Sequence, residues 1–189
     1  GNPIRGNNGY LIIKQPWPAM TRGLLNDDER YLETYWSKFE NIWFHGDYVL
    51  ADEDNLWYMK GRADDVINVS GHRMSTSEIE HTVISHKKIS DAASISIPDE
   101  LTGEAIVVFF VPENKNEINL EADIVEHINK KIGKIAKPKL IFQLSDLPKT
   151  RTGKIMRRLL KAKLIGNPLG DLSSLDNPDI LKEIDKFKI

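Results

Sequence analysis

The run AIVVFFVP, residues 105–112, limits the folds that this chain of 189 residues can adopt. A short apolar run of this kind is typical of a strand at the centre of a sheet. Apolar residues with helical spacing lie on both sides of it, over about residues 76–86 and 119–133, and AASISI and KLIFQL are further β-prone runs. A last helix is expected to begin near Gly153, with Lys154, Arg157, Arg158 and Lys161 largely outward. This alternation predicts a compact α+β unit with a small sheet and flanking helices.

The residues around this unit have a different pattern. Before it, GYLIIKQ is β-prone, a polar stretch follows, and DYVLADEDNLWYMKG predicts a hairpin because two β-prone runs flank the turn-forming DEDN. After it, GNPLGDLSSLDNP is rich in turn residues, and PDILKEIDKFK predicts a short terminal helix. We therefore expect a β-rich piece, the α+β unit and a tail, in that order.

The composition excludes several classes of protein. The absence of cysteine excludes disulfides, thiolate metal sites and a thiol nucleophile, and it agrees with a reducing compartment. The five histidines follow no zinc-binding pattern. No apolar run approaches the length that a bilayer requires, and no basic and then apolar leader stands at the start. We expect a cytoplasmic protein without a membrane partner.

The charge is distributed unevenly along the chain. Residues 129–163 hold twelve Lys or Arg and one acid, Asp146, so this segment carries +11 while the whole chain carries −2. A local anion site is implied. Phe142 is the segment's one aromatic residue and no nucleic-acid motif is present, so no nucleic acid is expected. A non-catalytic module that docks an acidic protein or nucleic acid remains an alternative.

The basic segment includes LPKTRTGKIMRRLL, which has a Thr-Gly pair among five cations. It is not a nucleotide-binding P-loop, because the required first Gly is missing before Gly153 and Ile155 occupies the position of the required Ser/Thr. A basic loop that opens a helix still suits an anion, since free N–H groups and the helix dipole add to the side-chain charges. A solvated basic turn is the plainer interpretation.

Two further motifs contain residues suited to a nucleotide. In GRADDVINVSGHR, Arg62 and Arg73 could clamp a phosphate, and Gly71 could let the backbone approach a ligand closely. In HGD, which we expect just before a strand, Asp47 could accept hydrogen bonds from a ribose diol. Surface Arg–Asp pairing and a turn-initiating Asp are the structural alternatives.

Taken together, HGD, GRADDVINVSGHR and LPKTRTGKIMRR resemble, in order and spacing, the C-terminal part of the AMP-forming acyl-CoA synthetases of the adenylate-forming superfamily. PWPAMTRGLLNDDERYLETYW, SGHRMSTSEIE and GDLSSLDNP are most similar to the members that activate acetate. The resemblance implies a fragment with three parts. These are the β-rich end of the large N-terminal domain (1–63), the mobile C-terminal domain (64–163) and a tail (164–189).

The resemblance also implies an activity in two steps. Acetate would attack Mg-ATP to give an acyl-adenylate and pyrophosphate, and coenzyme A (CoA) would then displace AMP, while the C-terminal domain rotates between the steps. A synthetase for propionate or another short acid is the alternative within this chemistry, and a domain that loads a carrier protein is a weaker one. The ligand ATP, the metal Mg and the substrate CoA follow from this reading, and the fragment alone is expected to be inactive.

The resemblance implies roles for single residues, by their positions in the family's motifs. Lys154 matches the adenylation lysine, which orients the carboxylate and offsets developing charge, and it is also a candidate for control by a lysine acetyltransferase and deacetylase. Asp47 and Arg62 match ribose-binding residues, Arg73 an arginine near the nucleotide phosphate, and Asp64 the hinge.

Further positions match the CoA and metal sites. Ser70 and Gly71 match backbone that meets the pantetheine arm of CoA. Asn129 stands where an arginine that contacts the CoA nucleotide is expected, so Lys130 or Lys131 is a candidate replacement. His45 replaces a more usual Thr beside the nucleotide. A surface magnesium site of bacterial relatives maps to Ile84, His86 and Ile89.

Overall fold

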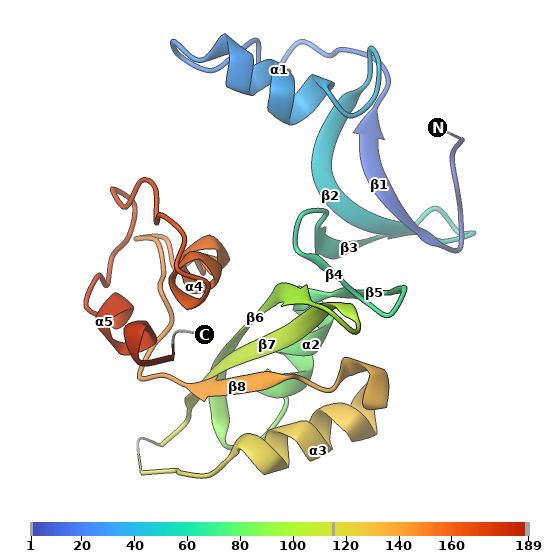
Figure 1. Cartoon of the computed structure of the whole chain (residues 1–189). Coiled ribbons are helices and arrows are strands. Elements are labelled where there is room, and N and C mark those ends of the chain that lie inside the picture. The colour runs from blue at the N-terminus through green and yellow to red at the C-terminus, as the bar shows by residue number, and fades with distance from the viewer. Residues whose placement is uncertain (1, 115, 188–189) are drawn as a thin grey trace. The chain divides into compact units, whose positions relative to one another are not determined.

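The computed structural model describes residues 2–114 and 116–187. The chain divides into two compact units, Gly1–Asp64 and Asp65–Ile189 (Figure 1). The α+β character predicted from the sequence is confirmed, because both units combine helices with antiparallel strands. The functional assignment of the three predicted segments stays a prediction.

The first unit is a three-stranded antiparallel sheet with one helix. The strands lie in the order β1-β2-β3. The predicted hairpin is confirmed, because β2 pairs with β3 from Asp47↔Arg62 to Ala51↔Trp57. The helix was not predicted; it begins after Asp27, whose carboxylate accepts from the Arg30 N–H at 3.3 Å. The elements are β1 Asn8–Ile13, α1 Asp28–Trp36, β2 Trp43–Ala51 and β3 Trp57–Arg62.

Aromatic side chains join this helix to the sheet. Trp43 on β2 is 6% exposed and stacks on Tyr35 of α1 with ring centroids 4.3 Å apart. Trp36 contacts the Trp43 ring edge-on, with ring centroids 5.7 Å apart. Because aromatic pairs bury large areas, this contact explains why a mostly polar helix stays on the sheet.

The second unit contains a five-stranded sheet. Its strands lie in the order β5-β4-β7-β6, and β8 pairs with β7 in parallel. The run AIVVFFVP lies in β7 between β6 and β8, so the prediction of a central strand is confirmed. The strands are β4 Val66–Val69, β5 His72–Ser75, β6 Ile89–Asp99, β7 Gly103–Pro112 and β8 Leu140–Gln143. The helices are α2 Thr76–Ile84, α3 Glu121–Lys131, α4 Arg157–Leu164 and α5 Ile180–Ile184.

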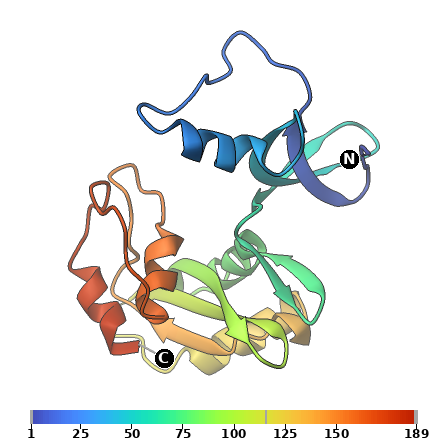
Figure 2. The ribbon, with the colours of Figure 1, turned by 45° about the horizontal axis from the view of Figure 1, so that its top comes forward.

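Alternate residues of β7 face two separate cores, as a strand buried on both faces requires. Val107 and Phe109 pack with α4, α5 and the tail. Val108 and Phe110 pack with α2 and α3. The unit is therefore a sheet between two helical layers, visible in Figure 1 and in the turned view of Figure 2.

The tail is part of this second unit. Leu175, Ile180, Leu181 and Ile184 are buried in the same core as α4, and the predicted terminal helix is present as α5. Arg158 donates to the carbonyls of the tail turn before it. Over residues 2–114 and 116–187, no helix is long and apolar enough to cross a membrane.

The last long helix begins later than predicted. The sequence placed its start near Gly153, but α4 begins at Arg157. The reason is a local turn: the Gly153 N–H donates to the Thr150 carbonyl at 2.8 Å, and Met156 N–H to the Pro148 carbonyl at 2.7 Å. The basic motif is therefore a hairpin loop, and the free N–H groups of a helix do not reinforce it.

Candidate functional site

The lysine loop, residues 149–155, is a tight backbone hairpin in the second unit. Lys149 and Ile155 form an antiparallel bridge at its base. Within the loop, the Thr150 N–H donates to the Lys154 carbonyl at 2.9 Å, and the Lys154 N–H donates to Thr150 Oγ1 at 3.1 Å. Gly153 has φ +81°, a conformation that favours glycine. These bonds fix the backbone of Lys154.

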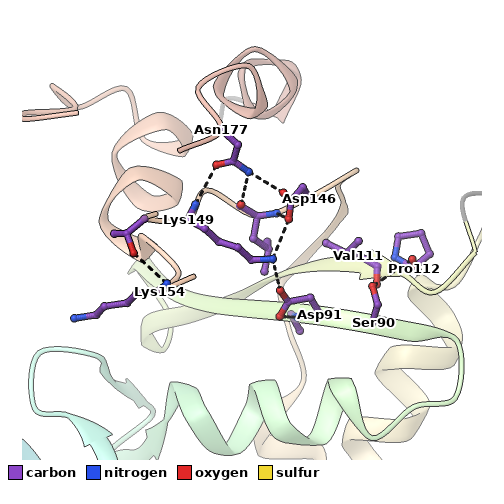
Figure 3. Close-up of polar contacts among 11 residues, drawn as sticks. Ser90, Asp91, Val111, Pro112, Asp146, Lys149, Lys154 and Asn177 are labelled. Atoms are coloured by element: carbon purple, nitrogen blue, oxygen red, sulfur yellow. Dashed lines mark hydrogen bonds and ion pairs between the residues drawn. The ribbon is translucent and has the colours of Figure 1, made fainter. Parts of the chain in front are cut away.

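Lys154 differs from most basic side chains around it. It is exposed, and in Figure 3 its side chain extends away from the labelled network of carboxylates. Among the residues that the structure describes, it forms no ion pair, whereas Lys149 and Arg157 both do. Its ammonium is thus free to meet an incoming carboxylate.

Lys149, at the base of the loop, is held by two carboxylates (Figure 3). Its Nζ lies 2.8 Å from Asp91 Oδ2 of β6 and 3.0 Å from Asp146 Oδ1. Burial lowers the pKa of Lys149, but hydrogen bonds from Asp91 and Asp146 outweigh this and raise the pKa. Lys149 therefore stays charged and fastens the loop to the sheet.

Arg157 holds the other side of the loop, where α4 begins. It forms two bonds with Glu80 of α2, Nε to Oε1 at 2.7 Å and Nη2 to Oε2 at 2.6 Å. Glu80 is 5% exposed and also accepts from the Ser94 N–H at 2.8 Å. The bond with Glu80 raises the pKa of Arg157. Arg157 was expected to point outward, and this expectation is wrong because it neutralises a buried acid.

Ser70 and Gly71 form the two-residue turn of the β4–β5 hairpin. Val69 pairs with His72, and the turn residues have φ +50° and +84°. Such turns suit hairpins because their twist matches the strands. The Ser70 N–H donates to the Thr102 carbonyl at 2.9 Å. Both turn residues are exposed, and so is Arg73 on β5.

Asp47, Arg62 and Asp64 lie together in the first unit. Arg62 Nη1 is 3.5 Å from Asp47 Oδ1, and its Nε is 3.2 Å from Asp64 Oδ1. His45 Nδ1 is 2.7 Å from the other Asp47 oxygen. HGD was expected before a strand, but it lies inside β2, where Gly46 has φ +87°. A Cβ at Gly46 would lie 2.6 Å from Arg62 Nη2, so glycine lets this arginine approach.

A pocket of about 230 Å³ opens beside this group. Lys38 reaches over the ring of Phe44 at its wall, with Nζ 4.3 Å from the centroid. The pocket is lined by Thr34, Tyr35, Lys38, Phe44, His45, Gly46, Arg62, Ala63 and Asp64. It combines an aromatic wall with cationic and anionic groups, which is the kind of lining that small polar ligands require.

Asn129, on α3, is partly buried. Its Oδ1 is buried without a hydrogen-bond partner among the residues described. This oxygen is an acceptor, so only the Nδ2 of Asn129 could donate to a phosphate oxygen. Lys130 and Lys131, in the last turn of α3, are exposed cations.

Ile84, His86 and Ile89 fit a magnesium ion poorly. Ile89 is buried, and the two isoleucines could offer only backbone carbonyls. Mg²⁺ prefers carboxylates and water oxygens. Within residues 2–114 and 116–187, no group of three or more His, Cys, Asp or Glu is placed to hold a metal. His86 instead meets the ring of His127 edge-on at 5.3 Å, and no chemical step is assigned to a metal here.

Residues 78–154 match the family model described as "AMP-binding enzyme C-terminal domain". Over these residues the chain is similar to that family. The matched range runs from α2 through the lysine loop and ends at Lys154 itself. The matched range contains β6, β7, β8, α3 and most of α2, whereas α4, α5 and the tail, which cover the other face of β7, lie outside it.

Curated relatives extend the likeness to nearly the whole chain. An acetyl-coenzyme A synthetase of Pyrobaculum arsenaticum is 45% identical over 98% of this chain. Another of Streptomyces avermitilis is 45% identical over 93%. The chain spans 28% of the length of each. Among solved structures, acetoacetyl-CoA synthetase from Streptomyces lividans has a TM-score of 0.84 and 25% identity, covering 98% of this chain and 29% of that one.

The second unit contains anchoring residues that the sequence did not point to. Glu80 and Asn177 hold the two sides of the lysine loop, although each is distant from it in sequence. For Glu80 a signal was available. It is an acid next to Ile79 on a helix, and an acid that is buried there needs a partner. No comparable signal marked Asn177.

Proposed function

We propose that this chain is the C-terminal part of an AMP-forming acetate:CoA ligase in which Lys154 is the adenylation lysine. The observation that carries the proposal is the exposed ammonium of Lys154, free of ion pairs among the described residues, on an ordered loop of an AMP-binding C-terminal domain. The acetyl-coenzyme A synthetases at 40–45% identity support acetate as the acid.

In the first step, a carboxylate oxygen of acetate attacks the α-phosphorus of Mg-ATP. The bond between the α-phosphorus and the oxygen that bridges to the β-phosphate breaks, and pyrophosphate leaves with the electron pair of that bond. Lys154 orients the carboxylate and offsets negative charge in the transition state. Asp47 and Arg62 bind the ribose, and Arg73 lies near the phosphate.

In the second step, the CoA thiol attacks the acyl carbon, AMP leaves and the thiol proton is released. Ser70 and Gly71 contact the pantetheine arm through backbone at the hairpin turn. Lys130 or Lys131 replaces the arginine expected at Asn129 for the CoA nucleotide. The rotation between the steps takes place at Asp64, a proposal supported by the division of the chain between Asp64 and Asp65.

The same proposal implies that the 189 residues alone do not turn over. They span 28% of the length of the Pyrobaculum arsenaticum relative, and the residues assigned above form only part of each substrate site. Measurable acetate-dependent thioester synthesis by the isolated chain would refute this.

The deciding experiment is acid-dependent ATP–pyrophosphate exchange by the full-length protein that contains this chain. Lys154→Ala should lower exchange by about 10²-fold or more, since one preorganised charge at a reaction centre has an effect of that order. Thioester formation from preformed acetyl-adenylate should persist. Arg151→Ala is the matched control, because Arg151 is another exposed cation of the same loop without an ion pair in the described residues.

Acetate and propionate should be offered separately in this assay. Exchange with acetate alone supports the acetate ligase, and equal exchange with propionate would make it a general short-acid synthetase. A basic docking module predicts salt-sensitive polyanion binding instead. Its cations are partly neutralised already, since Lys139, Lys149, Arg157 and Lys163 each pair with a carboxylate.

We further propose that the enzyme is cytoplasmic and that an acetyltransferase and a deacetylase control it at Lys154. Acetylation would neutralise the exposed ammonium and abolish the first step. A full-length enzyme carrying acetyl-lysine at position 154 should lose adenylation and keep the second step. Retention of its adenylation rate would overturn this control.

A further inference from the structure

The tail runs beside the base of the lysine loop. Thr150 and Leu175 form an isolated antiparallel bridge, and the Asp176 N–H donates to the Lys149 carbonyl at 2.9 Å. The loop base therefore has a backbone neighbour on its outer side. This neighbour comes from a part of the chain outside the matched domain.

The side chain of Asn177 continues this pairing. Its Oδ1 accepts from the Lys149 N–H at 3.1 Å, and its Nδ2 donates to the Leu147 carbonyl at 2.8 Å. The amide thus bonds the backbone on both sides of Pro148, as a neighbouring strand would (Figure 3). Nδ2 also donates to Asp146 Oδ2 at 2.8 Å.

Asp146 links Asn177 to the ion pairs of Lys149. One oxygen of Asp146 accepts from Asn177, and the other accepts from the Lys149 ammonium and from the Leu147 N–H at 2.7 Å. Lys149 in turn reaches Asp91 on β6. We call these four residues, Asp91, Asp146, Lys149 and Asn177, the loop anchor. They join the tail, the loop and the sheet.

The tip of the loop has little other support. Residues 151–154 are all exposed, and a Cβ at Gly153 would meet nothing within 4 Å. The position of Lys154 therefore depends on how firmly the base is held. A shift of about 1 Å in a reacting group can cost about 10²-fold in rate.

We propose that Asn177 is a positioning residue for Lys154 and that the tail is needed for adenylation through it. The inference rests on the proposed function of Lys154, which it deepens. Asn177 touches no substrate; it holds the loop base so that the ammonium meets the acyl carboxylate. It should matter in the step that uses Lys154 and not in thioester formation.

The test compares Asn177→Ala with Asn167→Ala in the full-length protein. Asn167 is an exposed tail residue, and no hydrogen bond of its side chain is found in the described part of the chain. Asn177→Ala should speed amide exchange and tryptic cleavage within residues 150–154 about five-fold or more, as loss of several hydrogen bonds would. Asn167→Ala should change neither.

The two half-reactions are measured in the same variants. With Asn177→Ala, acetate-dependent ATP–pyrophosphate exchange should fall about ten-fold through kcat, while acetyl-adenylate reacts with CoA within about two-fold of the wild-type rate. An equal loss in both half-reactions would indicate general damage and overturn the positioning role. Unchanged adenylation would overturn it as well.

Two further results separate this inference from the proposed function. If Lys154→Ala keeps adenylation, the assignment of Lys154 fails and the catalytic part of this inference fails with it. The exchange measurement then still decides whether Asn177 orders the loop. Should Asn177→Ala not fold, Asn177→Ser, which keeps a hydroxyl beside the Lys149 N–H, replaces it with the same criteria.

Discussion

The β4–β5 hairpin and the lysine loop each present an exposed turn on the same unit, but different forces hold them. The hairpin has four consecutive backbone pairs, from Val66↔Ser75 to Val69↔His72. The lysine loop has only isolated bridges at its base, Lys149↔Ile155 and Thr150↔Leu175, and depends on the side chains of the loop anchor. Backbone pairing tolerates most side-chain changes, whereas a side-chain anchor depends on each of its members.

The two turns carry residues that we assign to different half-reactions. The hairpin turn carries Ser70 and Gly71, which we assign to thioester formation, and the loop carries Lys154, which we assign to adenylation. Single side-chain substitutions should therefore weaken adenylation alone more easily than they weaken thioester formation alone. The following predictions test this, beginning with the largest effect.

The largest effect is expected at Arg157, where the lysine loop continues into α4. Arg157→Leu leaves Glu80, 5% exposed, without its charged partner. Breaking a buried ion pair in this way costs about 3–5 kcal/mol, and the free energy of unfolding in urea should fall by that amount. Arg151→Leu, an exposed cation of the same loop, is the control and should leave stability nearly unchanged.

A double variant sharpens this prediction. Adding Glu80→Leu to Arg157→Leu should restore part of the lost stability, because no charge then stays buried. The Ser94 N–H would still lose its acceptor, so recovery should be incomplete. If the double variant is less stable than Arg157→Leu alone, Glu80 has a stabilising role independent of Arg157.

The same contrast explains what the sequence could and could not predict. The β2–β3 hairpin and the central strand β7 follow from local pattern, and both are confirmed. The helix α1 was missed because a polar stretch gives no periodic signal, and an aromatic contact with Trp43 holds it. The start of α4 was misplaced because backbone bonds between Thr150 and Gly153 turn the chain first.

The candidate site divides in the same way. An exposed lysine beside a glycine can be recognised from its motif, since the residues that define it are adjacent in sequence. The contacts that hold the loop cannot, because Asn177 bonds a residue 28 positions away and Arg157, beside the loop, bonds one 77 positions away. Those pairings exist only after the two cores of the sheet have formed.

A smaller effect is expected at Lys149. Lys149→Met keeps the apolar stem but removes the ammonium from Asp91 and Asp146, whose side chains are 26% and 48% exposed. Because water can replace part of the loss, we expect about 1–2 kcal/mol less stability and faster amide exchange in the loop. Lys182→Met, which removes a fully exposed surface pair with Asp179, should have no measurable effect.

A comparable but purely conformational effect is expected in the hairpin. Gly71 has φ +84°, and a Cβ added there would meet no atom within 4 Å. Gly71→Ala should therefore cost only backbone strain, about 1–2 kcal/mol. Gly71→Asn should cost less, since Asn tolerates this conformation. Thermal unfolding measures both. Adenylation should stay within about two-fold in each, and a larger fall would break the separation between the two loops.

The smallest effect is a pH dependence confined to the lysine loop. Burial raises the pKa of Asp146, but the bonds from Lys149 and the Leu147 N–H outweigh it and lower the pKa. Stability from a carboxyl group with a lowered pKa is present above its unfolded value of about 3.9 and is lost as pH falls through the folded value. For Lys149, whose pKa is raised, stability is present below about 10.4 and lost above it.

The loop anchor should therefore hold at full strength between about pH 5 and 10. Amide protection in residues 150–154, corrected for intrinsic exchange, should fall about two-fold from pH 6 to pH 3.5, a modest change because the Asp146 side chain is 48% exposed. The Ser70 amide, which donates to a backbone carbonyl, is the internal reference. Asp146→Asn should remove the dependence from the loop. If it persists there, or appears equally at Ser70, the acid sensitivity belongs to the whole unit and the side-chain anchor does not distinguish the two loops.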